Sequence, residues 1–338
     1  MKAISLLRYL PIADPESLQD VELPAPTPEG REILVRVHAV SVNPVDTKVR
    51  SPKDTIESKP RVLGWDAAGV VEEVGPEATL FKPGDEVYYA GSIARPGSNS
   101  ELHAVDERIV GFKPRSLDFA RAAALPLTAI TAYEALFERM IIDREGRNEG
   151  ARLLVIGGAG GVGSIATQLA KLARLEVITT ASRDETRNFS RQMGADHVID
   201  HRGNMPEQLR ALGIQHVDYI LNTADTAGHW AAMAEMIKPQ GRISSIVESK
   251  TPVDITLLMR KSASFSWELM FTRPLFKTED MIRQHEILDE VAGWIDAGRL
   301  RTTMTEHLSP IDAANLRSAH EKLESGRMIG KVVLSGWG

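Results

Sequence analysis

The chain has 338 residues, which is enough for two domains. Its apolar and charged fractions, 43% and 25%, are those of an ordinary folded protein, and its formal net charge of −6 offers no overall attraction for nucleic acid. Because it contains no cysteine, disulfides, thiolate nucleophiles, iron–sulfur clusters and thiolate zinc sites are excluded. It shows no secretory signal and no apolar run of membrane-spanning length, so we expect a cytoplasmic protein without a membrane or nucleic-acid partner.

Short β-strands are predicted in the first third of the chain. Residues 33–40 partly alternate between apolar and polar side chains, and residues 69–74 precede a Gly-Pro breaker. A Pro-Gly turn at residues 83–84 comes before a third strand at residues 87–89. Short strands separated by glycine and proline predict a small barrel or sandwich.

Strands and helices alternate from about Thr128 onward. The predicted strands cover residues 153–156, 177–180, 197–199, 219–222 and 242–246. Helical stretches between several of them make the pattern typical of a doubly wound parallel sheet with helices on both faces, the Rossmann type of α/β fold.

A glycine-rich turn joins the first of these strands to the helix that follows. Its residues are Gly158, Ala159, Gly160, Gly161, Val162 and Gly163. A G-x-G-x-x-G turn in this position lets the backbone approach a pyrophosphate, and the N–H groups at the helix start bind its negative charge. The sequence therefore predicts a site for a nicotinamide dinucleotide.

The end of the second strand indicates which dinucleotide is bound. An NAD site carries an acidic side chain about 20 residues after the glycines. Here Ser182 and Arg183 occupy that region, with Arg187 one helical turn further. A hydroxyl and guanidinium groups bind a 2′-phosphate through charge-assisted hydrogen bonds, so we predict NADPH rather than NADH as the cofactor. The alternative is that both arginines are solvated surface residues and that Asp184 or Glu185 turns back toward the ribose.

Two helices are predicted near the C-terminus. Thr278 is a candidate cap for the first, which stops at Gly298. Ser309 is a candidate cap for the second, with Pro310 at its first position and Gly326 just past its end. Neither helix carries a chemically suggestive cluster, so both are interpreted as packing elements.

Several segments resemble the medium-chain dehydrogenase/reductase superfamily. They are Ser41-Val-Asn-Pro-Val-Asp46, Gly64-Trp-Asp-Ala-Ala-Gly-Val-Val71, Phe81-Lys-Pro-Gly-Asp-Glu-Val87, Leu125-Pro-Leu-Thr-Ala-Ile-Thr-Ala-Tyr133, the glycine turn and Gly330-Lys-Val-Val-Leu334. They span essentially the whole chain in the expected order. They look closest to the quinone oxidoreductase branch, in particular to zinc-type alcohol dehydrogenase-like proteins that lack the zinc ligands. The resemblance implies a GroES-like β-barrel catalytic domain at residues 1–127 and 276–338, and an NADP-binding Rossmann domain at residues 128–275.

The zinc ligands of this superfamily are replaced in the chain. Zinc-dependent relatives hold the catalytic metal with a cysteine, a histidine and a second cysteine, and the matching positions hold Asn43, Trp65 and Leu127. The nearest acidic residues, Asp46 and Asp66, do not by themselves make a four-coordinate site. We therefore expect a zinc-independent enzyme with no metal site.

The missing ligands also bear on the reaction. Without a metal to polarise an oxygen, oxidation of an unactivated alcohol loses its main charge-stabilising interaction. We predict instead that the protein uses NADPH to reduce a quinone or an α,β-unsaturated carbonyl, which accepts a hydride more readily. Reduction of simple aldehydes or ketones is one alternative, and an NADPH-binding subunit without catalytic activity is another.

Candidate catalytic and cofactor-binding residues follow from position and resemblance. Thr131 matches the threonine that contacts the nicotinamide in relatives, and Thr128 lies on the same segment. Asn222 ends a strand at the carboxyl edge of the sheet, where such folds bind ligands. Asn43 is a candidate donor to the substrate oxygen, while Asp46 is either catalytic or a cap on the neighbouring proline turn.

Four aromatic residues are candidates for the substrate pocket: Trp65, Tyr89, Trp267 and Phe271. Trp65 either walls the space that zinc would occupy or belongs to the core. Tyr89 and His103 are candidate proton donors, with a structural role as the alternative for each. By resemblance, the segment around Trp267 forms the edge strand of a homodimer interface, instead of or as well as lining the pocket.

Overall fold

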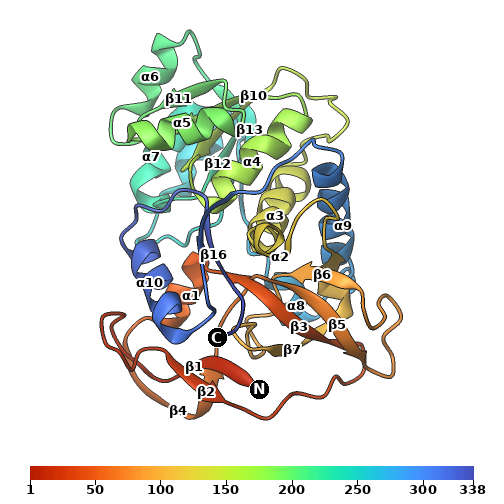
Figure 1. Ribbon diagram of the computed structural model, residues 1–338. Coiled ribbons are helices and arrows are strands. Elements are labelled where there is room, and N and C mark those ends of the chain that lie inside the picture. Colours follow the sequence, from red (N-terminus) through yellow and green to blue (C-terminus); the bar gives the residue numbers. More distant parts are fainter. The chain divides into compact units, whose positions relative to one another are not determined.

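The computed structural model describes residues 1–338 and divides them into two units. The first unit combines Met1–Leu127 with Phe271–Gly338, and the second is the continuous segment Thr128–Met270. In Figure 1 the second unit runs from yellow through green to light blue. The chain returns to the first unit at Phe271 rather than at residue 276, because Phe271 already packs within the first unit, against Trp65.

The first unit consists mainly of β-strands. They are β1 (Lys2–Tyr9), β2 (Gln19–Glu22), β3 (Glu32–Ser41), β4 (Lys53–Val62), β5 (Ala67–Val74), β6 (Glu86–Tyr89), β7 (Leu102–Asp106), β8 (Val110–Phe112), β15 (Met304–Leu308) and β16 (Lys331–Ser335). One sheet has the order β2-β1-β4, and the larger sheet has the order β15-β16-β3-β5-β6-β8, with β7 also paired to β3. The strands predicted at residues 33–40, 69–74 and 87–89 are confirmed as parts of β3, β5 and β6.

The C-terminal strand β16 lies inside the larger sheet. It is parallel to β15 on one side and antiparallel to β3 on the other, where Val333 pairs with Ser41. The strand begins with Lys331, which is buried like the apolar residues after it. The register therefore brings a lysine side chain to the segment that follows β3.

Short helices complete the first unit. They are α1 (Pro44–Arg50), η1 (Glu107–Ile109), α2 (Phe119–Ala123), α8 (Thr272–Phe276), α9 (Arg283–Asp296) and α10 (Ala313–Glu324). α3 (Pro126–Tyr133) begins in this unit and continues into the second.

Both predicted caps of the C-terminal helices are wrong. Thr278 lies before the start of α9 and donates its hydroxyl hydrogen to Asp280 at 2.6 Å, while Ile282 occupies the N-cap position. Ser309 and Pro310 precede α10, whose N-cap is Asp312, with a carboxylate that accepts the N–H of Asn315 at 2.7 Å. A serine followed by proline matched the expected pattern for a helix start, but the aspartate three residues further supplies an equally strong cap.

A parallel sheet forms the centre of the second unit, as predicted. Its strands are β9 (Arg152–Ile156), β10 (Glu176–Thr180), β11 (His197–Ile199), β12 (Val217–Asn222), β13 (Ile237–Ser245) and β14 (Ser264–Trp267), in the order β11-β10-β9-β12-β13-β14. The helices are η2 (Glu134–Arg139), α4 (Gly161–Leu172), α5 (Asp184–Gln192), α6 (Met205–Ala211), α7 (Thr226–Met236) and η3 (Ile255–Lys261). This is the doubly wound α/β arrangement.

Helices cover both faces of this sheet. α4 and α5 follow successive strands in one direction from β9, so right-handed crossovers place them on the same face, in front of the sheet in Figure 1. On the other face, Leu154, Ile178 and Ile220 form one apolar core with residues of α6, α7 and η3. Strands covered on both sides read as short apolar runs, which is why the sequence located them.

None of the helices combines the length and the apolar character needed to cross a membrane.

Candidate active site and nucleotide-binding residues

The glycine turn lies between β9 and α4 and leaves an open backbone at the helix start. Gly160 is the N-cap residue of α4, and a Cβ placed on it would have the carbonyl oxygen of Gly157 as its nearest neighbour, at 3.6 Å. A Cβ on Gly163 would lie 2.2 Å from that same oxygen, so this close approach of helix and turn requires glycine. Gly158, Gly161 and Val162 complete the turn. An uncovered helix N-terminus of this kind fits a dinucleotide pyrophosphate.

Ser182, Arg183 and Arg187 gather just after β10. Arg183 is the N-cap residue of α5, and its guanidinium lies 3.1 Å from the carboxylate of Glu185. The Arg187 guanidinium lies 3.5 Å from the carboxylate of Asp200, which follows β11. Both arginine side chains are partly exposed.

A further arginine of this region, Arg202, was not identified from the sequence. It donates a hydrogen bond to the backbone oxygen of Ser182 at 2.7 Å. Its position two residues after Asp200 carried no motif, so only the pairing of β10 with β11 reveals it.

Asn222 lies at the carboxyl end of β12, as predicted, but its side chain is occupied. Its amide nitrogen donates to the hydroxyl oxygens of Thr226 and Ser245, at 3.0 Å each. Its amide oxygen accepts the N–H of Ala224 at 3.3 Å. These bonds join β12, α7 and β13, so the side chain of Asn222 orders the edge of the sheet rather than presenting a free amide.

Thr128 and Thr131 lie one turn apart on α3 and are both buried. Residues three apart share one face of a helix, so the two hydroxyls line the same side. This placement keeps Thr131 as the candidate contact for the nicotinamide, with Thr128 beside it.

A buried polar network in the first unit connects the remaining catalytic candidates. The amide nitrogen of Asn43 donates to the backbone oxygen of Trp65 at 3.1 Å and to the carboxylate of Asp66 at 2.8 Å. Its amide oxygen accepts from Lys331, and its backbone N–H donates to the carboxylate of Asp46 at 2.8 Å. The structure therefore assigns Asn43 to positioning, because donation to a substrate oxygen would require one of these bonds to break.

Lys331 and Asp66 are the members of this network that sequence reasoning missed. The lysine ammonium lies 3.0 Å from the Asp66 carboxylate and also donates to the backbone oxygen of Val42 at 2.8 Å. The second carboxylate oxygen of Asp66 accepts the N–H of Leu127 at 2.8 Å. A lone lysine in an apolar strand was the available signal, because such a residue needs a buried partner.

Burial makes both carboxyl groups of the network harder to ionise. It raises the pKa of Asp46 from 3.8 to about 7, although the Asn43 N–H and the Lys331 charge act in the opposite direction. Burial likewise raises the pKa of Asp66, opposed mainly by the charge of Lys331. Asp46 therefore titrates close to neutral pH.

The three positions that hold zinc in metal-dependent relatives do not fit a zinc ion here. The donor groups of Asn43 are engaged in the network, and the indole N–H of Trp65 donates to the backbone oxygen of Ser92 at 3.3 Å. Leu127 has no side-chain donor atom, and the structure contains no group of three or more His, Asp or Glu residues arranged to bind a metal. Zinc prefers imidazole, thiolate and carboxylate ligands.

Trp65 and Phe271 pack together in the first unit. Their ring centroids are 6.3 Å apart and the planes are nearly perpendicular, at 76°. Both side chains are buried. Trp267, the other aromatic predicted from this segment, belongs to the second unit, lies on β14 and is 51% exposed.

Tyr89 and His103 form a buried pair. The Nε2 atom of His103 lies 2.9 Å from the backbone oxygen of Pro96, which can only accept, so the ring proton resides there. Nδ1 then accepts from the Tyr89 hydroxyl at 3.0 Å. Burial lowers the pKa of His103 to about 4 and raises that of Tyr89, so neither is suited to donate a proton near neutral pH.

A carboxyl pair in the second unit was also missed. Glu134 and Glu268 are both buried, and Arg139 lies 2.9 Å from Glu268 and 3.8 Å from Glu134. Burial, together with the neighbouring Glu134, raises the pKa of Glu268 to about 9. The two glutamates lie 134 positions apart along the chain, so no local pattern predicts their contact.

The second unit has the parallel sheet and glycine turn of a dinucleotide-binding fold. The first unit is a β-rich domain made from both chain ends. This combination is typical of a medium-chain dehydrogenase/reductase. Residues 29–115 match the alcohol dehydrogenase GroES-like domain and residues 193–334 match the zinc-binding dehydrogenase family. A zinc-type alcohol dehydrogenase-like protein of Staphylococcus aureus is 45% identical over 336 residues, which is 99% of this chain and 100% of the relative.

Comparison with solved structures points to the same family. A Rhizobium etli protein provisionally named a zinc-dependent alcohol dehydrogenase is 52% identical, with a TM-score of 0.94 over 100% of this chain and 98% of that one. The quinone oxidoreductase of Escherichia coli, solved with NADPH, is 26% identical, with a TM-score of 0.83 over 99% and 100% of the two chains. The chain therefore belongs to the medium-chain dehydrogenase/reductase superfamily, as an oxidoreductase that uses a nicotinamide dinucleotide. Within it, the chain is similar to zinc-type alcohol dehydrogenase-like proteins and has quinone oxidoreductases as structural neighbours.

Proposed function

We propose that the protein is a zinc-independent, NADPH-dependent reductase of quinones or α,β-unsaturated carbonyls. The observation that carries the proposal concerns the three positions that hold zinc in relatives: the side-chain donors of Asn43 and Trp65 are engaged in hydrogen bonds, and Leu127 has no side-chain ligand atom. Without a Lewis acid at the reacting oxygen, the acceptor itself must delocalise the incoming charge. Quinones and conjugated enones do so, whereas saturated alcohols do not. The E. coli neighbour, named a quinone oxidoreductase, supports the same substrate class.

NADPH, when bound, supplies the hydride for this reaction. The open backbone at Gly160 and the start of α4 would hold its pyrophosphate, and Ser182, Arg183 and Arg187 would hold its 2′-phosphate. The hydroxyls of Thr128 and Thr131 would orient the nicotinamide ring, as the resemblance of their segment implies.

The polar network of the first unit has a supporting role. Asn43 and Lys331 fix the carboxylate of Asp66, and Asp66 fixes the backbone N–H of Leu127. Asp46 holds the backbone of Asn43 at the start of α1. The donors of Asn43 and Lys331 are engaged within the network, so we assign the proton of the reduced oxygen to water.

The proposal is tested with purified enzyme and a panel of substrates. Loss of NADPH absorbance is followed with a quinone, a conjugated enone and a saturated aldehyde, and NADP⁺ reduction is followed with a secondary alcohol. Each reduction is repeated with NADH. We expect turnover with the quinone or the enone and a higher kcat/KM with NADPH. Activity confined to the saturated aldehyde or the alcohol contradicts the substrate class, and equal or better use of NADH contradicts the coenzyme. Binding of NADPH without turnover of any substrate indicates a non-catalytic subunit.

We also propose that two copies of the chain associate through β14. This strand forms one edge of the parallel sheet, so one side of its backbone lacks a strand partner within the chain. Trp267 on the strand and Leu269 just after it are 51% and 54% exposed. A second copy pairing along this edge would cover both side chains.

A further inference from the structure

Asp200 lies close to the loop that follows β10. It comes directly after the edge strand β11, whose register with β10 pairs Ile199 with Thr180, so Asp200 is near the loop that contains Ser182. The contacts of Asp200 therefore bear on what this loop can bind.

The carboxylate of Asp200 is occupied by arginine. One oxygen accepts the backbone N–H of Arg202 at 2.9 Å and its Nε–H at 3.3 Å, and the other accepts from the terminal guanidinium nitrogen at 3.0 Å. Arg187 lies 3.5 Å from this second oxygen. The hydrogen bonds from Arg202 lower the pKa of Asp200, so it stays ionised.

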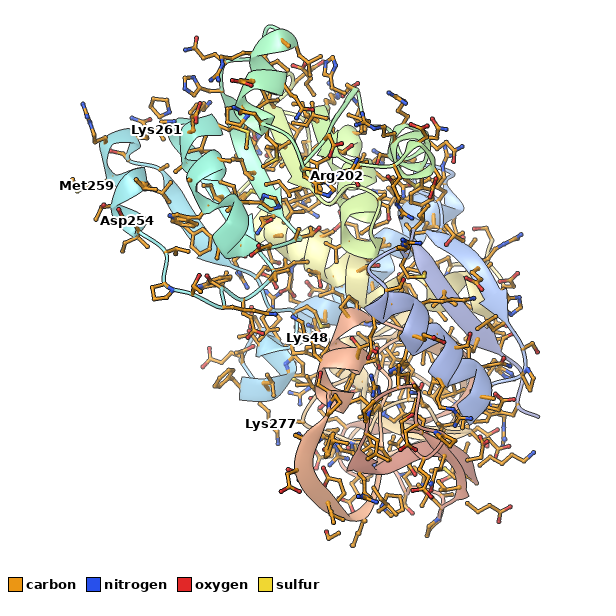
Figure 2. The ribbon with its side chains drawn as sticks, turned by 90° about the vertical axis from the view of Figure 1, so that its left-hand side faces the viewer. Lys48, Arg202, Asp254, Met259, Lys261 and Lys277 are labelled. Atoms are coloured by element: carbon orange, nitrogen blue, oxygen red, sulfur yellow. The ribbon has the colours of Figure 1, made fainter.

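Arg202 is also joined to the loop after β10. The same terminal nitrogen that contacts Asp200 donates to the backbone oxygen of Ser182 at 2.7 Å. Because Arg187 and Arg202 contact one carboxylate oxygen, their guanidinium groups lie close together beside Ser182 and Arg183. The side chain of Arg202, which is labelled in Figure 2, is 64% exposed.

The guanidinium groups of this cluster suit an anion. Those of Arg183, Arg187 and Arg202 lie near Ser182, paired with the carboxylates of Glu185 and Asp200. A phosphate monoester carries a charge of about −1.5 to −2 near neutral pH and accepts several hydrogen bonds. Planar guanidinium groups suit such a ligand better than single ammonium groups do.

We propose that Arg202 is a specificity-determining residue for the 2′-phosphate of NADPH and that Asp200 is its positioning residue. This inference rests on the proposed use of NADPH. Asp200 holds the Arg202 guanidinium against the loop at Ser182, beside Arg187, so that the guanidinium groups lie together where a phosphate would bind.

The test uses the full-length protein and two probes that differ by one phosphate, 2′,5′-ADP and 5′-AMP, with affinities measured by calorimetry. Wild type should bind 2′,5′-ADP more tightly. Arg202→Ala should weaken 2′,5′-ADP by about 10- to 100-fold, the range for a lost hydrogen bond to a charged group, and should leave 5′-AMP nearly unchanged. Asp200→Asn should lower the preference for 2′,5′-ADP in the same direction, because Arg202 loses its orientation.

The control is Arg210→Ala. Arg210 is an exposed arginine of the same unit, on α6, paired with Glu235 at 2.9 Å. Arg210→Ala should change neither the affinity for 2′,5′-ADP nor that for 5′-AMP. If wild type prefers 2′,5′-ADP and Arg202→Ala keeps that preference, Arg202 is not a specificity residue. Tighter binding of 2′,5′-ADP by Asp200→Asn overturns the positioning role. If wild type itself shows no preference, the proposed use of NADPH fails and this inference fails with it.

Discussion

Lys331 and Asp66 form an ion pair of 3.0 Å in which the two side chains are only 4% and 0% exposed. They lie in the first unit, beside the residues that replace the zinc ligands of metal-dependent relatives. The pair is fully hydrogen-bonded, since Asn43, Val42 and Leu127 supply the other contacts. A buried ion pair whose hydrogen bonds are all made fixes the positions of its neighbours. Removing one of its two members lowers the stability of the fold, because the other charge is then buried without a partner.

Replacing Lys331 with methionine should therefore destabilise the protein strongly. The substitution leaves the Asp66 carboxylate buried without a counter-charge, which costs about 3–5 kcal/mol. Urea unfolding measures this loss. Lys322→Met is the matched control, because Lys322 pairs with Glu306 at the surface, where an ion pair contributes at most about 1 kcal/mol.

The double variant Lys331→Met, Asp66→Asn separates charge from packing. It should lose less stability than the sum of the two single variants, because no unpaired charge remains. Strict additivity, or a loss for Lys331→Met no larger than that of the control, would show that the buried pair is energetically unimportant.

The stability of the fold should depend on the ionisation of Asp46. The usual pKa of an aspartate side chain is 3.8, and burial raises the pKa of Asp46 to about 7 in the folded protein. The folded state therefore holds the proton more tightly, so the contribution of Asp46 to stability is complete below about pH 4 and is lost as the pH rises to about 7.

Asp46→Asn removes this titration and keeps an oxygen for the Asn43 N–H. The variant should gain stability relative to wild type between about pH 5 and about pH 7, with a constant difference above that range. Urea unfolding across this pH range provides the measurement. Parallel pH profiles for the two proteins would mean that Asp46 does not titrate there.

Substitution by alanine should have different effects at two glycines of the turn, Gly160 and Gly163. At Gly160 the added methyl has room, so Gly160→Ala should change stability by less than about 1 kcal/mol but weaken NADPH binding at least about 10-fold, because the methyl occupies the space for the pyrophosphate. At Gly163 the methyl meets a backbone oxygen at 2.2 Å, so stability should fall by about 1–3 kcal/mol. Thermal unfolding and calorimetry distinguish the effects; unchanged NADPH affinity in Gly160→Ala would place the coenzyme elsewhere.

Removal of metal should leave the activity intact. We expect protein purified without added metal to contain far less than one equivalent of zinc, and dialysis against a chelator to leave kcat unchanged, because Asn43, Trp65 and Leu127 offer no zinc-binding set. Elemental analysis and activity assays measure both. Tightly bound stoichiometric zinc, or activity restored only by zinc, would contradict the proposed mechanism.

The proposed dimer depends on exposed apolar side chains near β14. Leu269→Asp should shift wild-type dimers toward monomers in light scattering, since the new charge would be buried at the interface. Leu212→Asp changes another exposed leucine of the second unit and should leave the mass unchanged. A monomeric wild type, or a dimer unaffected by Leu269→Asp, argues against this interface.

The sequence was informative where one local pattern determines the structure. The buried strands of the second unit are short apolar runs, and the glycine turn has a fixed spacing, so both were located in advance. Helix caps were less certain, because Ser309 and Asp312 both suit the role and only packing selects Asp312.

Contacts between distant residues were beyond such patterns. The contact of Asn43 with Lys331 could not be predicted, since nothing near Asn43 in the sequence points to a lysine on the last strand. The residues predicted from the sequence to bind the 2′-phosphate did not include Arg202. This arginine contacts Ser182 only because β10 and β11 are neighbouring strands. In both cases side chains on different strands meet through sheet register, which the spacing of residues along one strand does not reveal.

The position of β16 at the end of the chain has a consequence for biosynthesis. Asp66 and Lys331 are separated by 265 positions, so at about 5–20 residues per second the acid leaves the ribosome roughly 10 to 50 seconds before its counter-ion. The uninterrupted second unit is fully translated within that interval, whereas the first must wait for its final strand. The carboxylate of Asp66 thus meets its counter-ion only after the whole second unit has been synthesised.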